Sequence, residues 1–405
     1  MTTEEQKEFG RRVAFLRRKL GYSQSEFARK IDRSEAWLSQ VERGGRAIDR
    51  MAVLERLAEA LNVPLSELAP NKAGVVGTAR EPGLANPLVL TLASNVPMRA
   101  MLAMPAEPVD VTRLEERAEQ AWSFAHEARF DELSQLLTKL LPDIEVAERH
   151  VAEIDRVQVL RAKARSYLAA AGVLAKLGET GAAWVAIDRA MNAAERLGDP
   201  LLMAEGAFRL AVTFQVARRF DLAIRVADSA AQSISTLMQD ADADPAAIAL
   251  HGALHLQLAV ANARINDADA AYGHLDIARD AADRIGEGRN DYHTEFGPAN
   301  VLLHEVAVAV ELGDAGRALR VAERAAATHL SAERRGRLMI DVAQANAQLR
   351  RFDAVIAALA EGFRIAPHQL ATHSRVRELV ADLLRSEHSR RPEVRALAKK
   401  VQVVG

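Results

Sequence analysis

Apolar residues in the first 70 positions recur every three or four residues, which is the spacing of short amphipathic helices. Phe9, Val13, Leu16 and Leu20 lie on one face of the first predicted helix, which ends at Gly21. The same spacing predicts further inward-facing residues at Phe27, Ala28, Ile31, Leu38, Val41, Leu54, Leu57, Leu61, Leu65 and Leu68. Residues 1–70 are therefore predicted to fold as five short helices around one core.

Serine residues mark the beginnings of the second and third predicted helices. Ser23 and Glu26 form a capping box, in which each side chain satisfies a free backbone N–H group. Ser34 is placed to cap the third helix, which ends at Arg43-Gly44-Gly45. The pattern therefore predicts two short helices joined by a tight turn.

Proline sets the next segment apart. Six of the 13 prolines fall between Pro70 and Pro108, and proline fixes φ and removes a backbone donor. Residues 71–110 are therefore predicted to be a linker rather than a long helix. Its middle, Leu88 to Met104, is apolar, so we expect it to dock on a surface. The pattern leaves open whether that surface belongs to the same subunit or to another.

From about residue 111 to the end, the pattern is helical and repeats internally. Each copy has a turn followed by a pair of small residues seven positions apart. These pairs are Ala183/Ala190, Ala223/Ala230, Ala271/Ala278 and Ala318/Ala325, with degenerate copies at Leu133/Leu140 and Val355/Gly362. Small side chains allow two helices to approach closely, and a hairpin with one apolar face must stack on its neighbours. Residues 111–405 are thus predicted to be an α-solenoid, and the whole chain to be all-α.

Composition narrows the class of protein further. The chain has 405 residues, too many for one ordinary core, and only 4% of them are aromatic. It has no cysteine, which excludes disulfides, thiolate zinc sites and cysteine nucleophiles. Its first ten residues are acidic rather than apolar, unlike a signal peptide. No stretch is expected to reach the roughly 20 apolar residues that cross a bilayer. We therefore expect a soluble, cytoplasmic protein.

The run from Leu20 to Ile31, followed by Ser34 to Gly44, resembles the XRE-type helix-turn-helix of phage repressors and their bacterial relatives. The shared pattern is Ser-Gln-x-x-x-Ala, a tight turn, a helix ending in Glu-x-Gly, and Leu-x-x-Leu-Ala-x-x-Leu-x-Val from Leu54 to Val63. The likeness covers residues 9–69. It implies a lambda-repressor-like DNA-binding domain over residues 1–70, where 13 Lys and Arg face 11 Asp and Glu.

The third helix of this domain carries the predicted base contacts. Leu38 and Val41 face the core, which turns the short polar side chains of the helix outward. The expected base contacts are Glu35, Ala36, Ser39 and Gln40. By resemblance, the expected phosphate contacts are Gln24, Arg43, Arg46 and Arg50. Some relatives of this fold use it for protein contacts, so a domain that does not bind DNA is the alternative.

The repeat in residues 111–405 resembles tetratricopeptide repeats, with the best spacing at Phe352, Val355, Gly362 and Pro367. This architecture is similar to that of Gram-positive regulators, including the RRNPP peptide receptors, and the Ala/Arg-rich composition resembles an actinobacterial member. The likeness implies a peptide or small-molecule effector in the concave face. It also implies a homodimer on a palindromic operator, with the repeats holding the two subunits together.

Polar stripes on the predicted inner helices, and an insertion before one of them, supply the effector candidates. These are His251, His255, Asn262, Tyr292, Phe296, Asn300, His304 and Asp341. An asparagine amide can pair with a peptide backbone as donor and acceptor together. The simpler alternative is that the stripes form a solvated concave surface.

Enzyme chemistry finds no support in the sequence. No glycine-rich phosphate loop is present. His251 and His255 are four residues apart, but no carboxylate lies between them, and His304-Glu305 lacks the second histidine of a zinc hydrolase. We therefore expect no enzyme activity, metal or cofactor. The alternative to a signal-responsive regulator is a scaffold, in which the repeats bind a partner protein and the N-terminal domain localises it.

Overall fold

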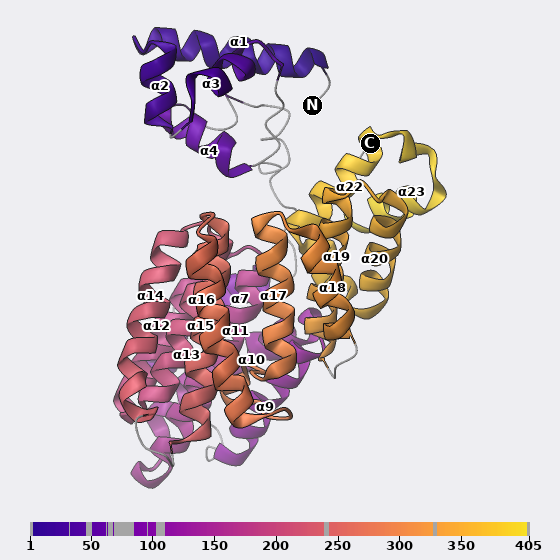
Figure 1. Ribbon diagram of the computed structural model, residues 1–405. Helices are drawn as coiled ribbons and strands as arrows, with labels where there is room; N and C mark the ends of the chain where they lie inside the picture. Colours follow the sequence, from indigo (N-terminus) through magenta and orange to yellow (C-terminus); the bar gives the residue numbers. More distant parts are fainter. Residues whose placement is uncertain are drawn as a thin grey trace. The chain divides into compact units, whose positions relative to one another are not determined.

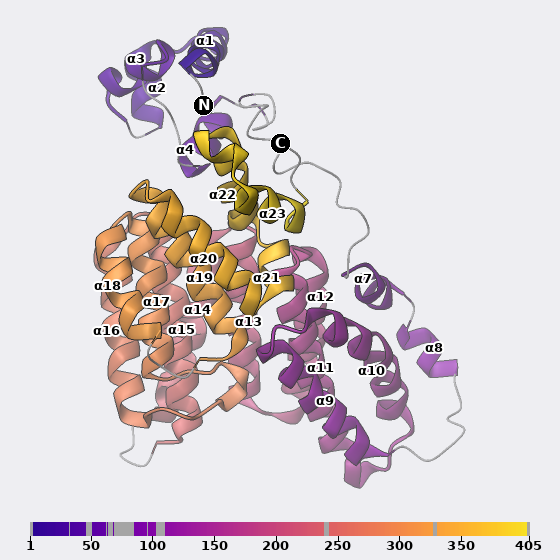
Figure 2. The same ribbon diagram turned by 90° about the vertical axis from the view of Figure 1, so that its right-hand side faces the viewer.

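The computed structural model describes residues 3–31, 33–45, 51–61, 63, 68, 85–94, 96–102, 110–238, 243–326 and 330–402 (Figures 1 and 2). Within these ranges the chain forms helices and no strands, so the predicted all-α class is confirmed. The chain divides into two compact units, Met1–Glu81 and Pro82–Gly405. Each unit has its own buried core.

The first unit contains four described helices, α1 (Thr3–Lys19), α2 (Gln24–Lys30), α3 (Glu35–Glu42) and α4 (Met51–Ala60). The predicted inward-facing residues from Phe9 to Leu61 that are described are buried in one cluster, apart from Leu20. That side chain is 43% exposed, because α1 ends one residue earlier and Gly21 turns the chain away with a φ of +78°. Leu65 and most of the fifth predicted helix lie outside the described residues.

A buried ion pair connects α1 to the end of α3. The guanidinium of Arg17 donates two hydrogen bonds to the carboxylate of Glu42, at 2.6 and 3.0 Å. A third Arg17 nitrogen donates to the carbonyl oxygen of Tyr22 at 2.6 Å, and the amide of Gln24 donates to Glu42 at 2.6 Å. One carboxylate therefore fixes α3 relative to α1 and α2.

The second unit is a stack of helical hairpins that follow one another in chain order (Figure 1). Six hairpins form its body: α9 (Val111–His126) with α10 (Phe130–His150), α11 (Arg156–Lys176) with α12 (Thr180–Leu197), α13 (Pro200–Val216) with α14 (Phe220–Ser235), α15 (Pro245–Arg264) with α16 (Ala268–Ile285), α17 (Pro298–Leu312) with α18 (Ala315–Ala326), and α19 (Ala332–Gln348) with α20 (Phe352–Ile365). Helices α21 (Pro367–Thr372), α22 (Ser374–Arg385) and α23 (Pro392–Lys400) complete it. This architecture confirms the predicted solenoid.

Each of the six hairpins turns in the same way. One residue between its two helices adopts a left-handed backbone conformation, and the second helix begins two residues later. These residues are Ala128, Gly178, Arg218, Asn266, Gly313 and Arg350. After each turn, the predicted columns of small residues are packed against the first helix, and Ala183, Ala190, Ala271 and Ala278 are at most 1% exposed. The repeat in the sequence is therefore a repeat of turn geometry and close helix packing.

The proline-rich segment contributes two helices to the second unit. Helix α7 (Ala85–Ala93) lies against α10 and α12, and α8 (Val96–Leu102) lies against α10. Leu88 and Leu92 are buried in the core of the hairpins, and Arg189 donates a hydrogen bond to the carbonyl oxygen of Leu92 at 3.0 Å. The described part of the apolar segment thus docks on the repeats of its own chain.

The solenoid curves until its last body hairpin meets its first. Helix α19 contacts α9, and one buried cluster joins residues of α9–α12 to residues of α19–α23 (Figure 2). Lys176 forms an ion pair with Glu333 at 2.9 Å, and His368 lies 3.3 Å from Asp131. The first helices of successive hairpins, from α11 to α19, contact one another, so they line the inside of the curve. That inner surface is therefore enclosed by the chain itself.

One described helix, α15, is long and apolar enough by composition to span a membrane, although the sequence was expected to contain no such stretch. Of its apolar window, 89% is buried against the other helices. An all-round apolar helix is typical of a packed protein interior, so its composition matches its place between α13, α16 and α17.

Breaking the Arg17–Glu42 pair should loosen the first unit. We expect Arg17→Met to lower the local stability of α3 by about 3–5 kcal/mol, because an unpaired carboxylate then stays buried. Amide hydrogen exchange of α3 in the full chain measures this loss. Arg12→Met is the matched control, since Arg12 pairs with Glu8 near the surface and such pairs contribute at most about 1 kcal/mol. Equal protection of α3 in both variants would contradict the prediction.

Candidate functional site

The outer face of α3 is the first candidate site. Leu38, Val41 and Glu42 are buried on its inner side. The four predicted base contacts lie on the other side, where Glu35, Ala36 and Gln40 are exposed and Ser39 is half-buried. The hydroxyl of Ser34 accepts a hydrogen bond from the backbone N–H of Trp37 and so fixes the start of α3. The helix therefore presents a short polar face from a firmly held backbone.

The predicted phosphate contacts have different environments. Arg43 is exposed at the end of α3, and its Nε donates to the carbonyl oxygen of Ser39 at 3.2 Å. Gln24 stands at the first position of α2, where its side-chain amide is engaged with Glu42. Arg46 and Arg50 lie outside the described residues. The sequence predicted only a DNA phosphate contact for Gln24. It did not predict that the Gln24 side chain supports the Arg17–Glu42 ion pair.

A basic hollow lies beside the start of α3. It has a volume of about 400 Å³ and is lined by Arg29, Arg33, Ser34 and Trp37. The guanidinium of Arg33 lies 5.5 Å from the centre of the Trp37 ring, and Arg29 and Arg33 are both exposed. Two cations next to a helix N-terminus make this hollow suited to an anion.

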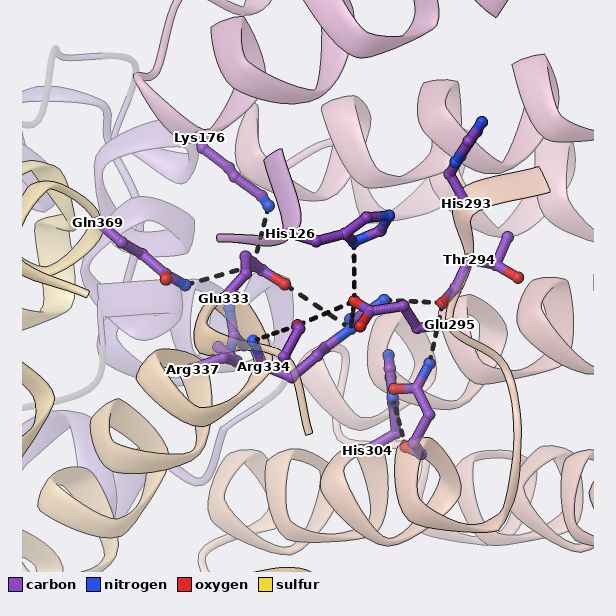
Figure 3. Close-up of polar contacts among 12 residues, drawn as sticks. His126, Lys176, His293, Thr294, Glu295, His304, Glu333, Arg334, Arg337 and Gln369 are labelled. Carbon is purple, nitrogen blue, oxygen red and sulfur yellow. Dashed lines mark hydrogen bonds and ion pairs between the residues drawn. The ribbon is translucent and has the colours of Figure 1, made fainter. Parts of the chain in front are cut away.

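The inner surface of the solenoid is the second candidate site, and it is polar (Figure 3). The carboxylate of Glu295 lies 3.2 Å from Nδ1 of His126, 3.3 Å from Nε of Arg334 and 3.1 Å from the hydroxyl of Ser331. Burial by itself raises the pKa of Glu295, but His126 and Arg334 outweigh it and lower the pKa. Glu295 is thus held as an anion by groups from α9 and α19.

A second anion lies next to the first. Glu333 forms an ion pair with Lys176 at 2.9 Å and accepts a hydrogen bond from Gln369 at 3.3 Å (Figure 3). Its carboxylate is also 3.7 Å from Arg334. Burial raises the pKa of Glu333, but Lys176 and Arg334 more than compensate and bring that pKa to about 2. The two glutamates and their cations therefore form one charged cluster at the centre of the solenoid.

Three of the predicted effector residues belong to this inner surface. Asn300 donates its amide to the carbonyl oxygen of Thr294 at 3.2 Å, and Nδ1 of His304 lies 2.9 Å from the carbonyl oxygen of Asn300. Asp341 is completely buried and accepts a hydrogen bond from Arg337 at 3.1 Å. Burial lowers the pKa of His304 to about 3, so this histidine is neutral at ordinary pH.

Polar contacts continue from Asp341 across the solenoid. Arg375 lies 3.6 Å from Asp341 and donates to Glu311 at 2.8 Å. Glu311 also accepts from Arg264 at 3.1 Å, and Arg264 donates to the amide oxygen of Gln215 at the same distance. These contacts connect α19, α22, α17, α15 and α13, so charged groups cross the whole inner surface.

The structure does not bring His251, His255 and Asn262 to this surface. Nδ1 of His255 lies 2.9 Å from Nδ1 of His274 on α16, and the rings of His251 and His255 are 4.5 Å apart. Asn262, seven residues further along α15, donates to the carbonyl oxygen of Leu258. Burial lowers the pKa of His255 to about 3, with smaller effects from His251 and His274. Among the described residues, no group of three or more His, Asp and Glu side chains is arranged to hold a metal ion.

Several buried acceptors on the inner surface have no hydrogen-bond partner within the protein. Both carboxylate oxygens of Glu205 are in this state, and so is one side-chain oxygen of each of Asn300, Asp341 and Gln369. Glu205 is 1% exposed, and its nearest cation, Arg209, is 3.6 Å away. Burial outweighs Arg209 and raises the pKa of Glu205 to about 7. A buried acceptor without a protein partner is costly unless water or a ligand supplies a donor.

The insertion between α16 and α17 lies against this surface. Tyr292, His293 and Glu295 have left-handed φ angles of 50°, 54° and 49°. The ring of His293 stacks on Trp122 with 4.1 Å between centroids, and Phe296 is 1% exposed. Sequence reasoning found Tyr292 and Phe296 in this segment. It missed partners on other hairpins, among them Trp122, His126, Arg209, Ser331 and Arg334.

The first unit is similar in sequence to known helix-turn-helix domains. The family model described as "Helix-turn-helix domain" matches residues 8–70. An uncharacterised HTH-type transcriptional regulator of Bacillus subtilis (strain 168), YazB, is 37% identical over 62 residues, which is 15% of this chain and 88% of that relative.

A solved structure is similar over a longer part of the chain. The crystal structure of Bacillus thuringiensis PlcR in complex with the peptide PapR7 and DNA matches with a TM-score of 0.29 and 14% sequence identity. The match covers 69% of this chain and 95% of that one. The solenoid is assigned from its own hairpin geometry.

Space for the Phe296 ring depends on Gly252 of α15. A Cβ atom at residue 252 would lie 2.0 Å from that ring, whereas one at Gly273 of α16 would meet nothing within 4 Å. We expect Gly252→Ala to destabilise the solenoid by about 1–3 kcal/mol through overpacking. Gly273→Ala, the matched control, should stabilise it by up to about 1 kcal/mol. Denaturant unfolding of the full chain measures both, and a Gly252→Ala variant as stable as wild type would contradict this.

Proposed function

Because the chain belongs to the helix-turn-helix transcriptional regulators, we propose that it reads an operator with α3 under the control of an effector bound inside its solenoid. The observation that carries the proposal is the polar inner surface with its buried, unpartnered acceptors. Such a surface suits a peptide or another small polar molecule better than an apolar partner protein.

The exposed face of α3 is suited to the major groove. Gln40 offers a side-chain amide that can pair bidentately with adenine, and Glu35 can accept from the amino group of cytosine. Ala36 can contact a thymine methyl group, and Ser39 can donate or accept. These four side chains are the proposed base contacts.

Phosphate contacts flank this face. By resemblance, Arg43, Arg46 and Arg50, which follow α3 in the sequence, would hold DNA phosphates, and Gln24 would offer the free N–H groups at the start of α2 rather than its engaged side chain. The hollow at Arg29 and Arg33 adds a further anion contact. One such domain covers half of a palindromic site, so we propose a homodimer that acts in the cytoplasm.

The effector would contact Asn300, His304, Asp341 and the neighbouring charged cluster. Because ligand and operator binding are linked, an effector that favours one arrangement of the dimer changes operator affinity. The scaffold alternative calls for exposed apolar area inside the curve, whereas the described inner surface is lined by charged and amide side chains. The regulator therefore has the stronger support.

Substitution of Gln40 should separate the contribution of base contacts to DNA affinity from that of contacts with the DNA phosphates. With genomic fragments selected by the full chain, we expect Gln40→Ala to reduce affinity for the preferred sequence about 10- to 100-fold, as loss of about 1–3 kcal/mol implies. Affinity for bulk DNA should stay unchanged. Arg43→Ala should instead weaken binding to every sequence and reduce the slope of affinity against salt by about one.

The two variants serve as controls for each other. An unchanged sequence preference in Gln40→Ala would remove this residue from the base contacts. Failure of the wild-type protein to enrich any fragment over bulk DNA, with and without cell extract as a source of effector, would refute the proposed operator binding.

A further inference from the structure

The segment Asn290–Phe296 lies against the first helices of five hairpins. It contacts Trp122 and His126 on α9, Arg209 on α13, Gly252 on α15, Asn300 on α17 and Arg334 on α19. This segment therefore shows which chemical groups the inner surface recognises.

We propose that the inner surface is a peptide-binding site that the chain's own Asn290–Phe296 occupies, and that its external ligand is a short peptide with an acidic residue followed by an aromatic one. The proposal rests on the proposed function, since it specifies the effector of that site. It also assigns the insertion a role as an internal competitor of that effector.

The main chain of the segment is bound as a peptide ligand is bound. Arg209 donates to the carbonyl oxygen of His293 at 3.0 Å. Arg334 and Asn300 donate to the carbonyl oxygen of Thr294 at 2.9 and 3.2 Å. Two consecutive carbonyl groups thus receive donors from three different helices. Such contacts recognise a backbone whatever side chains it carries.

The side chains of the segment enter sites of matching chemistry. Glu295 is surrounded by His126, Ser331 and Arg334 (Figure 3). The next residue, Phe296, is buried against Gly252, which leaves no room for anything larger than hydrogen when the ring is in place. A carboxylate site beside an aromatic site specifies an acidic residue followed by an aromatic one.

The segment is bound under strain. Tyr292, His293 and Glu295 are not glycine, yet each has a φ angle near +50°, a left-handed conformation that is strained for a residue with a side chain. The guanidinium of Arg334 is also shared, because it donates hydrogen bonds both to the carboxylate of Glu295 and to the carbonyl oxygen of Thr294. The internal occupant is therefore held less tightly than its contacts alone would allow.

Tethering explains how a strained occupant remains in place. A segment joined to α16 and α17 at both ends competes at an effective concentration on the order of millimolar. A free peptide of the same sequence must exceed that concentration to displace it. Removal of the internal copy should therefore expose the site to a peptide supplied in solution.

The test uses the full chain with residues 290–296 replaced by a Gly-Ser sequence of equal length. The probe is a fluorescein-labelled heptapeptide, Asn-Asp-Tyr-His-Thr-Glu-Phe, and fluorescence anisotropy measures its binding. We expect the replaced variant to bind the probe at least tenfold more tightly than wild type. A probe with Gln in place of Glu should lose at least tenfold in affinity for the same variant.

A matched pair of substitutions identifies the site. Added to the replaced variant, Arg334→Met should abolish probe binding, because it removes a ligand of both the carboxylate and the backbone. Arg317→Met should leave binding unchanged, since Arg317 pairs with Glu305 and lies over the ring of Tyr272, away from the segment. If circular dichroism shows that the replaced variant is unfolded, Glu295→Gln takes its place, and it should bind the probe several-fold more tightly than wild type.

Two outcomes separate this inference from the proposed function. A folded variant that binds both probes as weakly as wild type overturns the inference, whatever its behaviour on DNA. A variant that binds the probe as expected, but whose affinity for selected genomic fragments does not change with probe, supports the peptide site and refutes effector control of operator binding.

Discussion

Close packing of the two helices in each hairpin is the constraint on which the rest of the solenoid depends. Alanine columns such as Ala271 and Ala278 are completely buried, and larger side chains there would push the helices apart. The hairpins then stack through their first helices and curve until α19 reaches α9. A slight change in helix separation would add up over six hairpins and open that contact.

Closure of the curve gives the interior its chemistry. Of the side chains that would be solvated in an open solenoid, Glu205 and Asp341 become buried and Glu311 becomes half-buried. Removing a charge from water is costly unless it is paired, and most of these groups have partners on other hairpins. Glu311 lies between Arg264 and Arg375, which hold its pKa at about 2 although burial raises it. Glu205 has the weaker partner, which is why its pKa moves in the opposite direction.

The local sequence pattern was sufficient to predict most of the described helices, but not α7 and α8 in the predicted linker, nor the contacts of the inner surface. The helix-turn-helix and the hairpin turns were predictable, because caps, periodicity and small-residue columns are properties of neighbouring residues. Leu20 was assigned to the core because its spacing fits, but α1 ends before it. Most partners of the insertion were missed because they are far away in sequence. The pairs His126–Glu295 and Lys176–Glu333 form only when the curve closes.

His251 and His255 were placed on the wrong side of α15 because that helix is buried all round, so its apolar pattern does not distinguish its faces.

The stack of Trp122 on His293 makes the protein its own optical reporter. The chain has three tryptophans; Trp122 stacks on the inserted segment, whereas Trp37 belongs to the first unit and Trp184 is 58% exposed. The imidazole of His293, 4.1 Å from the indole between centroids, and the guanidinium of Arg209, 4.7 Å from the same ring, are the immediate neighbours of this indole. Departure of His293 would therefore change the intrinsic fluorescence of the buried Trp122 indole. Displacement of the segment Asn290–Phe296 from the inner surface could thus be followed in the unlabelled protein.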